Sequence, residues 1–179
     1  MSSGTACFIR CMRVSDLERL AEINLDQWTE TFHTKFYMSY LLQWPECCAV
    51  AETCDGTLCG YLIGKVEGEG DLWHSHISAI TVANEFRSSG VARQLMDYLE
   101  DLSEDEKFDC FFVDLFVRGS NKVALQFYEK LGYVIYRRVE GYYGGQEDAF
   151  DMRKPLKRDV ERNCIKNAGR LVQPEDLEW

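Results

Sequence analysis

The sequence lacks any run of 18 apolar residues, which excludes a membrane-spanning helix of ordinary length. Its first 14 residues also lack the apolar core of a signal peptide. Without a secretory route, we expect the eight cysteines to be reduced thiols rather than a disulfide framework, as in a cytoplasmic protein.

Metal-ligand spacing is also missing from the chain. No C-x₂-C pair occurs, although structural zinc sites usually carry such pairs. The cysteines nearest to two neighbouring histidines fall in or beside strand-like runs, where a free cysteine packs as a small apolar residue. We therefore favour buried thiols and no metal over a zinc site built from Cys47, Cys48, Cys54, Cys59, His74 and His76.

Basic residues are outnumbered, with 20 Lys and Arg against 30 Asp and Glu and a net charge of -10. This balance counts against nucleic acid as a partner, because phosphate binding depends on clustered Lys and Arg. It suits a cationic partner, although a solvated acidic surface explains such a charge more often.

The 179 residues are enough for one domain with a buried core. Apolar periodicity predicts helices and strands in the order ααββββαβαββ, which describes a mixed α/β sheet with helices on both faces. The first helix is expected to begin at a capping box formed by Ser15 and Glu18. A second helix is expected to end at Pro45. Gly132 is well placed to end a later helix.

A short turn, Arg87–Ala92, joins the strand-like run "WHSHISAITVA" to a helical pattern. The first amides of that helix have no partner within the helix, and with the helix dipole they favour an anion such as pyrophosphate. Gly90 lets backbone approach the anion closely, and Arg87 can add a charged contact. On these residues alone, an ordinary strand-to-helix turn is the stronger interpretation.

A second strand-turn-helix follows, in "CFFVDLFVR" and "SNKVALQFYEKLG". Asn121 and Tyr128 are about two helical turns apart, so we expect their side chains to point the same way. Tyr128 as a plain core residue is the alternative.

The two stretches "ITVANEFRSSGVARQLMDYLE" and "NKVALQFYEKLGY" together resemble the acetyl-CoA-binding core of the GNAT N-acetyltransferase superfamily. Ala124, Tyr128, Gly132 and Tyr133 fit its A-x-x-x-Y-x-x-x-G-F/Y helix. The segments "INLDQWTETF", "WHSHISAITVANEFR" and "EDAFDMRK" further resemble the catalytic subunits of NatB-type N-terminal acetyltransferases. The resemblance implies the GNAT fold, with a mostly antiparallel sheet splayed at the cofactor, over residues 1–156. Residues 157–179 are then a charged C-terminal tail.

The resemblance also implies a reaction, in which the α-amine of a peptide attacks the thioester of acetyl-CoA directly, with no covalent intermediate. Tyr128, beside the thioester sulfur, His76 and Glu30 would form the catalytic centre. Residues expected to contact acetyl-CoA are Ile80, Val82, Arg87, Ser88, Ser89, Gly90, Val91, Ala92, Asn121 and Tyr128. Residues expected to contact the peptide are Glu30, Phe32, His76, Ser78, Tyr142 and Tyr143.

Members of this type acetylate nascent chains that begin Met-Asp, Met-Glu, Met-Asn or Met-Gln. His76 is our choice for reading the second residue, whereas His74, two residues earlier on the same strand face, is more often structural in such a place. The resemblance implies a large helical-repeat auxiliary subunit that docks the enzyme at the ribosome. Alternatives are a GNAT enzyme that acetylates lysine or polyamine amines, and a non-catalytic acyl-CoA-binding subunit.

Overall fold

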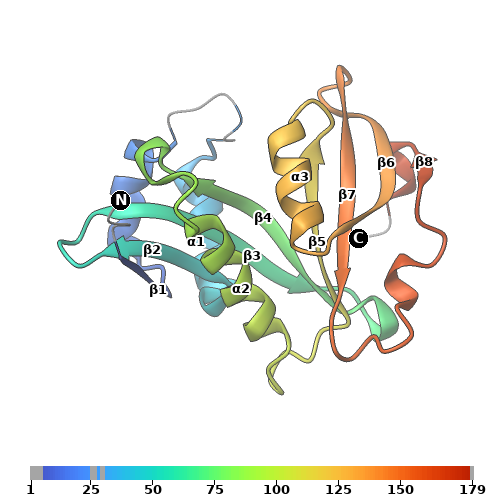
Figure 1. Cartoon of the computed structure of the whole chain (residues 1–179), viewed down its shortest axis with the longest axis horizontal. Helices are drawn as coiled ribbons and strands as arrows, with labels where there is room; N and C mark the ends of the chain where they lie inside the picture. Colours follow the sequence, from blue (N-terminus) through green and yellow to red (C-terminus); the bar gives the residue numbers. More distant parts are fainter. Residues whose placement is uncertain (1–5, 25–27, 29–30, 178–179) are drawn as a thin grey trace. The chain divides into compact units, whose positions relative to one another are not determined.

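The structure is a computed structural model, and it describes residues 6–24, 28 and 31–177 (Figure 1). The chain divides into two compact units. The first contains Met1–Lys65 and Ile77–Leu102, and the second contains Val66–His76 and Ser103–Trp179. Strand β4 (His74–Val82) begins in the second unit and ends in the first.

The first unit is built on antiparallel strands. Strand β2 pairs with β1 on one side and with β3 on the other, and a bulge at Ala51 and Glu52 shifts the second register. Among the described residues of this unit, the strands other than β4 are β1 (Cys7–Cys11), β2 (Cys48–Thr53) and β3 (Leu58–Glu67).

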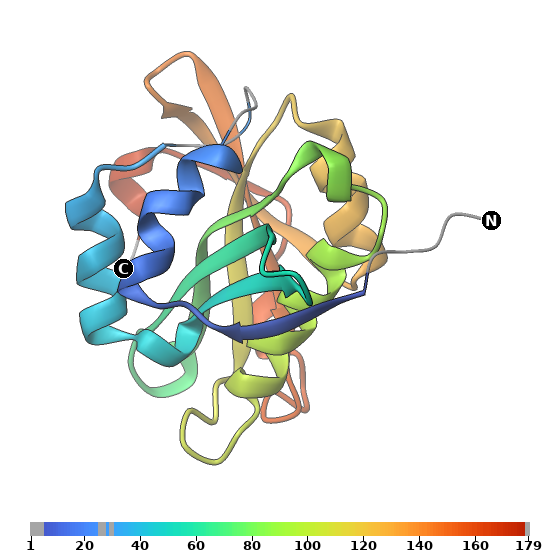
Figure 2. The ribbon, with the colours of Figure 1, turned by 90° about the vertical axis from the view of Figure 1, so that its left-hand side faces the viewer.

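Helical segments cover both faces of these strands (Figures 1 and 2). One face packs Val50 and Tyr61 against Leu20 and Tyr37, which come from the first two helical segments. Residues at alternate positions, such as Ala49 and Ala51, are equally buried because successive side chains of a strand point to opposite faces. The helical segments are η1 (Val14–Glu22), α1 (Thr34–Gln43), η2 (Pro45–Cys47), η4 (Asn84–Phe86) and α2 (Val91–Ser103).

The start of the first helix differs from the prediction. It is a 3-10 helix that begins at Val14, and the carboxylate that closes it belongs to Asp16 rather than Glu18. Asp16 accepts the Arg13 amide at 2.8 Å and two hydrogen bonds from the Arg10 guanidinium at 2.7 and 2.9 Å. The guanidinium holds the carboxylate beside Arg13, so the helix begins two residues earlier than the Ser15 motif indicates.

The second unit contains a mixed set of strands. Strand β7 pairs antiparallel with β5 and with β6, while β8 pairs parallel with β6. The strands are β5 (Phe112–Arg118), β6 (Val134–Tyr143), β7 (Glu147–Pro155) and β8 (Arg170–Val172). The helical segments are η3 (Gly70–Leu72), α3 (Lys122–Lys130), η5 (Asn163–Ile165) and η6 (Pro174–Asp176).

Gly132 ends α3 as predicted. Its φ is +93°, its amide donates to Glu129 at 3.0 Å, and the Tyr133 amide donates to Tyr128 at 3.0 Å. These two hydrogen bonds are those of a Schellman motif, which glycine permits because it adopts the left-handed conformation without strain.

Two strands were not expected from the sequence, and one expected strand is absent from the described residues. β1 and β8 are short and largely exposed on their side-chain faces, so they have little apolar alternation to reveal them. Between α1 and α2 the described chain forms three strands rather than four. Part of the predicted tail is structured in β8 and η6, and the boundary at residue 156 stays a prediction.

All eight cysteines are free thiols, and five of them are buried. Burial raises the pKa of Cys48 and of Cys59 to about 11, so both stay protonated near neutral pH. None of the helices in the described part of the chain is long and apolar enough to cross a membrane.

Candidate active site

The predicted anion-binding turn lies in the first unit, where β4 leads into α2. Arg87 Nε donates to the Val82 carbonyl at 3.1 Å, and the Ser89 hydroxyl donates to the Phe86 carbonyl. These contacts fold the turn tightly back on the end of β4. Ser88, with φ at +59°, is the one residue of the turn besides Gly90 in the left-handed region.

Gly90 makes the change of direction into α2. Its φ is +92°, and a Cβ added there would meet nothing within 4 Å, so the position faces open space. The first helical hydrogen bond is donated by Gln94 to the Gly90 carbonyl at 3.1 Å. The amides of Val91, Ala92 and Arg93 precede that bond, and they are the donors that a helix start offers to an anion. Glycine is thus needed here for its backbone conformation.

The strand before the turn is held close to β3. A Cβ on Gly60 would lie 2.6 Å from the Thr81 carbonyl oxygen and 3.2 Å from the Cα of Val82. Only glycine permits that approach without a shift of backbone. Val82 is buried and Ile80 is half-buried, so the edge that the sequence assigns to the cofactor belongs to a rigid strand.

Two predicted peptide contacts also belong to the first unit. Phe32 stacks on Phe36 with ring centroids 4.0 Å apart, and this places it in the aromatic cluster of α1. Ser78 Oγ lies 2.8 Å from the hydroxyl of Tyr40. Tyr40 was not singled out from the sequence, because it reads there as one of several apolar-face residues of α1.

In the second unit, α3 carries the two residues assigned to the cofactor. Asn121 is the N-cap, and its Oδ1 accepts the Ala124 amide at 3.1 Å. It therefore lies outside the helix, and the two-turn spacing that we expected to align it with Tyr128 does not apply. Tyr128 is 7% exposed. Burial, with a smaller contribution from Tyr143, raises its pKa far above the ordinary tyrosine value, so the phenol keeps its proton.

His76 is paired with a carboxylate that the sequence analysis overlooked. Its Nδ1 lies 2.8 Å from Oδ1 of Asp114, which is buried in strand β5. Burial by itself would raise the pKa of Asp114, but the charge and hydrogen bond of His76 and the charge of His74 outweigh it and hold that pKa below its usual value. A charged residue in the apolar run "CFFVDLFV" was the signal that could have found it.

A chain of aromatic contacts leads away from His76 along the same unit. His76 lies 5.9 Å from the Phe116 ring, and Phe116 stacks on Tyr142 at 5.0 Å. Tyr142 meets Tyr143 edge to face at 5.1 Å, and the Arg118 guanidinium lies 4.0 Å from the Tyr143 ring. Three of the predicted residues are thus linked through Phe116, which the sequence analysis did not select.

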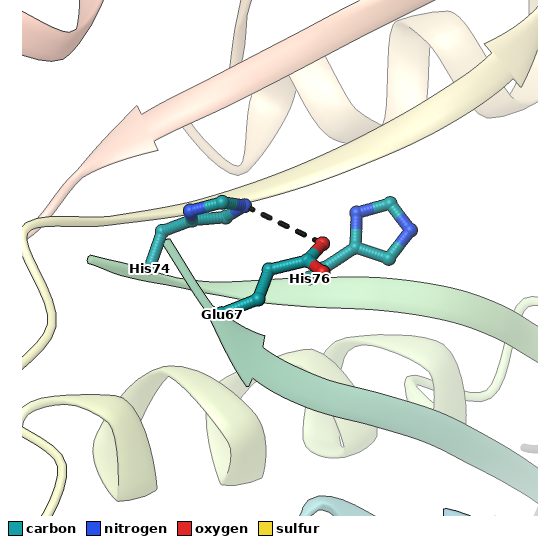
Figure 3. Close-up of side chains that lie close together, drawn as sticks. All are labelled: Glu67, His74 and His76. Carbon is teal, nitrogen blue, oxygen red and sulfur yellow. Dashed lines mark ion pairs between the residues drawn. The ribbon is translucent and has the colours of Figure 1, made fainter. Parts of the chain in front are cut away.

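His74 lies beside His76 on the same face of β4, as strand alternation requires. Its ring stacks on Phe112 at 4.6 Å, and its Nδ1 lies 2.6 Å from the Leu72 carbonyl oxygen. Figure 3 shows the two imidazoles together with Glu67, from the end of β3. Glu30, the remaining predicted catalytic residue, lies outside the described residues.

The chain is similar to known acetyltransferases. Residues 17–133 match the family model described as the acetyltransferase (GNAT) family. The chain is 50% identical over 172 residues to the N-terminal acetyltransferase B complex catalytic subunit NAA20 of Arabidopsis thaliana, which covers 96% of this chain and 98% of the relative. It is 53% identical over 166 residues to the corresponding catalytic subunit of Schizosaccharomyces pombe, with coverage of 89% and 91%.

Solved structures of acetyltransferases are also similar to the chain. The chain is similar to Chaetomium thermophilum Naa20 in complex with a bisubstrate analogue, with a TM-score of 0.87, 42% identity and coverage of 94% and 97%. It is also similar to a chain of the NatB acetyltransferase complex bound to a bisubstrate inhibitor, with a TM-score of 0.83, 37% identity and coverage of 96% and 99%.

Proposed function

The chain belongs to the acetyltransferase (GNAT) family, and from this premise we propose that it is the catalytic subunit of a NatB-type N-terminal acetyltransferase. Family membership confirms the α/β GNAT fold and the acyltransferase activity expected from the sequence. The proposed substrates are nascent chains that begin Met-Asp, Met-Glu, Met-Asn or Met-Gln. The observation that carries the proposal is the extent of the similarity to NatB catalytic subunits, which spans nearly the whole chain rather than the cofactor motif alone.

Acetyl-CoA is the proposed acetyl donor. The amides that begin α2, together with Arg87, Ser88 and Ser89, would hold its pyrophosphate. The backbone at Ile80 and Val82 would pair with the pantetheine arm as an added strand does, and one of these amides would polarise the acetyl carbonyl. The Nδ2 amide of Asn121 is the group left for the cofactor, because its Oδ1 caps α3.

The proposed chemistry is direct attack of the α-amine on the thioester carbonyl. An α-amine has a pKa of about 7.7–8.0, so part of it is neutral at physiological pH and no strong base is needed. Tyr128, which keeps its proton because burial raises its pKa, would donate a hydrogen bond to the departing thiolate. The proton that the attacking nitrogen loses would pass to water. Glu30 would steer the amine into place.

His76 is proposed to read the side chain of the second residue. Asp114 accepts from Nδ1, so Nε2 donates to a carboxylate only when the ring is an imidazolium. In the neutral ring, Nε2 accepts, which suits the amide N–H of asparagine or glutamine.

The remaining peptide contacts are apolar or weakly polar. Phe32, Ser78, Tyr142 and Tyr143 are each proposed to contact the peptide. These assignments are supported by the aromatic clusters described for each unit.

A partner subunit is part of the proposal. Relatives are named as catalytic subunits of a complex, and one similar structure is of the NatB complex. We propose an auxiliary subunit of helical-repeat type, association with ribosomes through it, and a cytoplasmic location.

The test is acetyl transfer from acetyl-CoA to short peptides, with and without the auxiliary subunit. The panel contains Met-Asp, Met-Glu, Met-Asn and Met-Leu peptides, a Ser-Glu peptide, and a blocked peptide with an internal lysine. We expect turnover only where methionine precedes an acid or amide. Activity confined to the lysine peptide would overturn the substrate assignment and leave the cofactor assignment in place.

A further inference from the structure

Glu67, His74 and His76 place three potential metal ligands in one part of the second unit (Figure 3). One ligand atom from each residue lies within 4.8 Å of the other two. We propose that these side chains bind a divalent transition-metal ion, with Zn²⁺ as the best fit. This binding does not depend on the proposed function.

The backbone fixes the distance between Glu67 and the histidines. They are joined by a tight turn in which Gly68 has a φ of +92°. A Cβ on Gly68 would lie 2.1 Å from the Leu72 carbonyl oxygen and 3.3 Å from Nδ1 of His74. The turn closes only with glycine, so the end of β3 and the start of β4 are held in a defined register.

The orientation of the His74 ring selects the nitrogen that a metal would use. A carbonyl oxygen only accepts hydrogen bonds, so the contact with Leu72 at 2.6 Å assigns a hydrogen to Nδ1. Nε2 then faces carboxylates, with Oε1 of Glu67 at 3.9 Å and Oδ1 of Asp114 at 3.5 Å. A cation bound there would be flanked by these two carboxylate oxygens.

The His76 ring is held by a carboxylate. The ring nitrogen that faces Glu67 and His74 is Nδ1 (Figure 3), and its contact with Oδ1 of Asp114 at 2.8 Å orients the ring. An ion bound to Nδ1 would replace the hydrogen of that contact and take the Asp114 carboxylate as a further ligand. The His74 ring is oriented in a different way, by the Phe112 ring against which it stacks. Both imidazoles are therefore held in place before any ion arrives.

The donor set indicates the class of ion. Two imidazole nitrogens and one carboxylate favour Zn²⁺, Co²⁺ or Ni²⁺ over Mg²⁺ and Ca²⁺, which prefer oxygen ligands. Tetrahedral zinc with bonds of about 2.1 Å would draw the three atoms to about 3.4 Å apart, which requires small side-chain rotations. A groove of about 700 Å³ lined by Glu67 and His74 gives an ion access from solvent. Arg137 and Arg153 also line it, but both are paired with the buried Asp151.

The experiment titrates the purified full chain with Zn²⁺ and Co²⁺ by calorimetry and absorption, with Mg²⁺ as the comparison ion. We expect one tight site for Zn²⁺ and Co²⁺ and none for Mg²⁺. The cobalt spectrum should show visible bands without a sulfur-to-cobalt charge-transfer band, which distinguishes this site from the exposed thiols. A sulfur-ligated spectrum, or no binding, would overturn the proposal.

Variants locate the site. Glu67→Gln and His74→Ala should each weaken Zn²⁺ binding at least tenfold, whereas the matched controls Glu69→Gln and His33→Ala should not. Glu69 is an exposed acid that lines the same groove. His33 is the one histidine of the chain outside the proposed site. Glu67→Gln keeps the shape of the side chain, so the test survives if His74→Ala unfolds. Equal Zn²⁺ affinity in all four variants would overturn the assignment of the site to Glu67 and His74.

Discussion

The two units carry their functional groups in different ways. In the first unit, the groups assigned to the cofactor are mainly backbone amides, set in place by the left-handed Gly90 and the start of α2. In the second, the groups assigned to the cofactor and to the peptide are side chains, of which Tyr128 is buried and His76 is held by Asp114. The first should therefore be sensitive to changes of backbone conformation, and the second to changes of single side-chain atoms.

The largest expected effect belongs to the second unit. Tyr128→Phe removes only a hydroxyl, and we expect it to lower kcat by about 10²–10³-fold, the contribution usual for a positioned hydrogen-bond donor. The KM for acetyl-CoA and the melting temperature should change little. Steady-state kinetics and circular dichroism measure these quantities, and wild-type turnover in the variant would refute the role of the phenol.

A buried acid of the first unit, Asp16, should affect stability rather than catalysis. Asp16 is 3% exposed. Burial alone would raise its pKa, but hydrogen bonds from Arg10 and the Arg13 amide outweigh it, and the pKa lies below the usual aspartate value. We expect Asp16→Asn to lower the free energy of unfolding by about 2 kcal/mol at neutral pH.

That loss should depend on pH in a defined direction. A carboxyl with a lowered pKa in the folded state stabilises the protein above its unfolded-state pKa of about 3.9, and the contribution disappears as pH falls through the folded-state pKa. The difference between wild type and Asp16→Asn in denaturant unfolding should therefore shrink at acid pH. A difference that is the same at neutral and acid pH would contradict this explanation, and peptide preference should not change at all.

Asp114→Asn sharpens the comparison, because the same change in the second unit should alter specificity. Loss of the carboxylate weakens the hydrogen bond that orients the His76 ring, and we expect kcat/KM for Met-Asp peptide to fall about tenfold relative to Met-Asn peptide. The ratio between the two peptides is the measurement, so a general loss of folding does not imitate the result. An unchanged ratio would remove His76 from second-residue recognition.

The smallest expected effect belongs to the backbone turn of the first unit. Gly90→Ala adds a methyl group that meets nothing, so only the φ of +92° opposes it. Left-handed backbone costs a non-glycine residue about 1–2 kcal/mol, so the KM for acetyl-CoA should rise about tenfold with kcat retained. Gly56→Ala, at another left-handed glycine of the same unit (φ of +88°) in the turn between β2 and β3, is the matched control. Equal KM values in the two variants would contradict a role for the glycine conformation.

The same contrast explains what the sequence could predict. The local motifs around Gly90 and Gly132 predict a turn before α2 and the end of α3. The structure confirms that Gly132 ends α3 in the left-handed conformation. Asp114 and Phe116 become relevant only through pairings across strands, which spacing along the chain does not reveal. Asn121 shows the limit of periodicity, because it caps the helix instead of lying within it.

Strands β1 and β8 show the corresponding limit for the fold. Each is defined by backbone pairing to a neighbour distant in sequence, β2 and β6 respectively, and neither has the apolar pattern of a central strand. The helices and strands with a buried stripe were predictable because burial imposes a period on the sequence.

The most direct test of this account is a single kinetic titration of acetyl-CoA at saturating Met-Asp peptide, for Gly90→Ala and Tyr128→Phe side by side. The account predicts opposite changes: a raised KM with normal kcat in the first variant, and a lowered kcat with normal KM in the second. If both variants showed a lowered kcat together with a raised KM, backbone groups would not be separable from side-chain groups in their roles, and this explanation would be wrong.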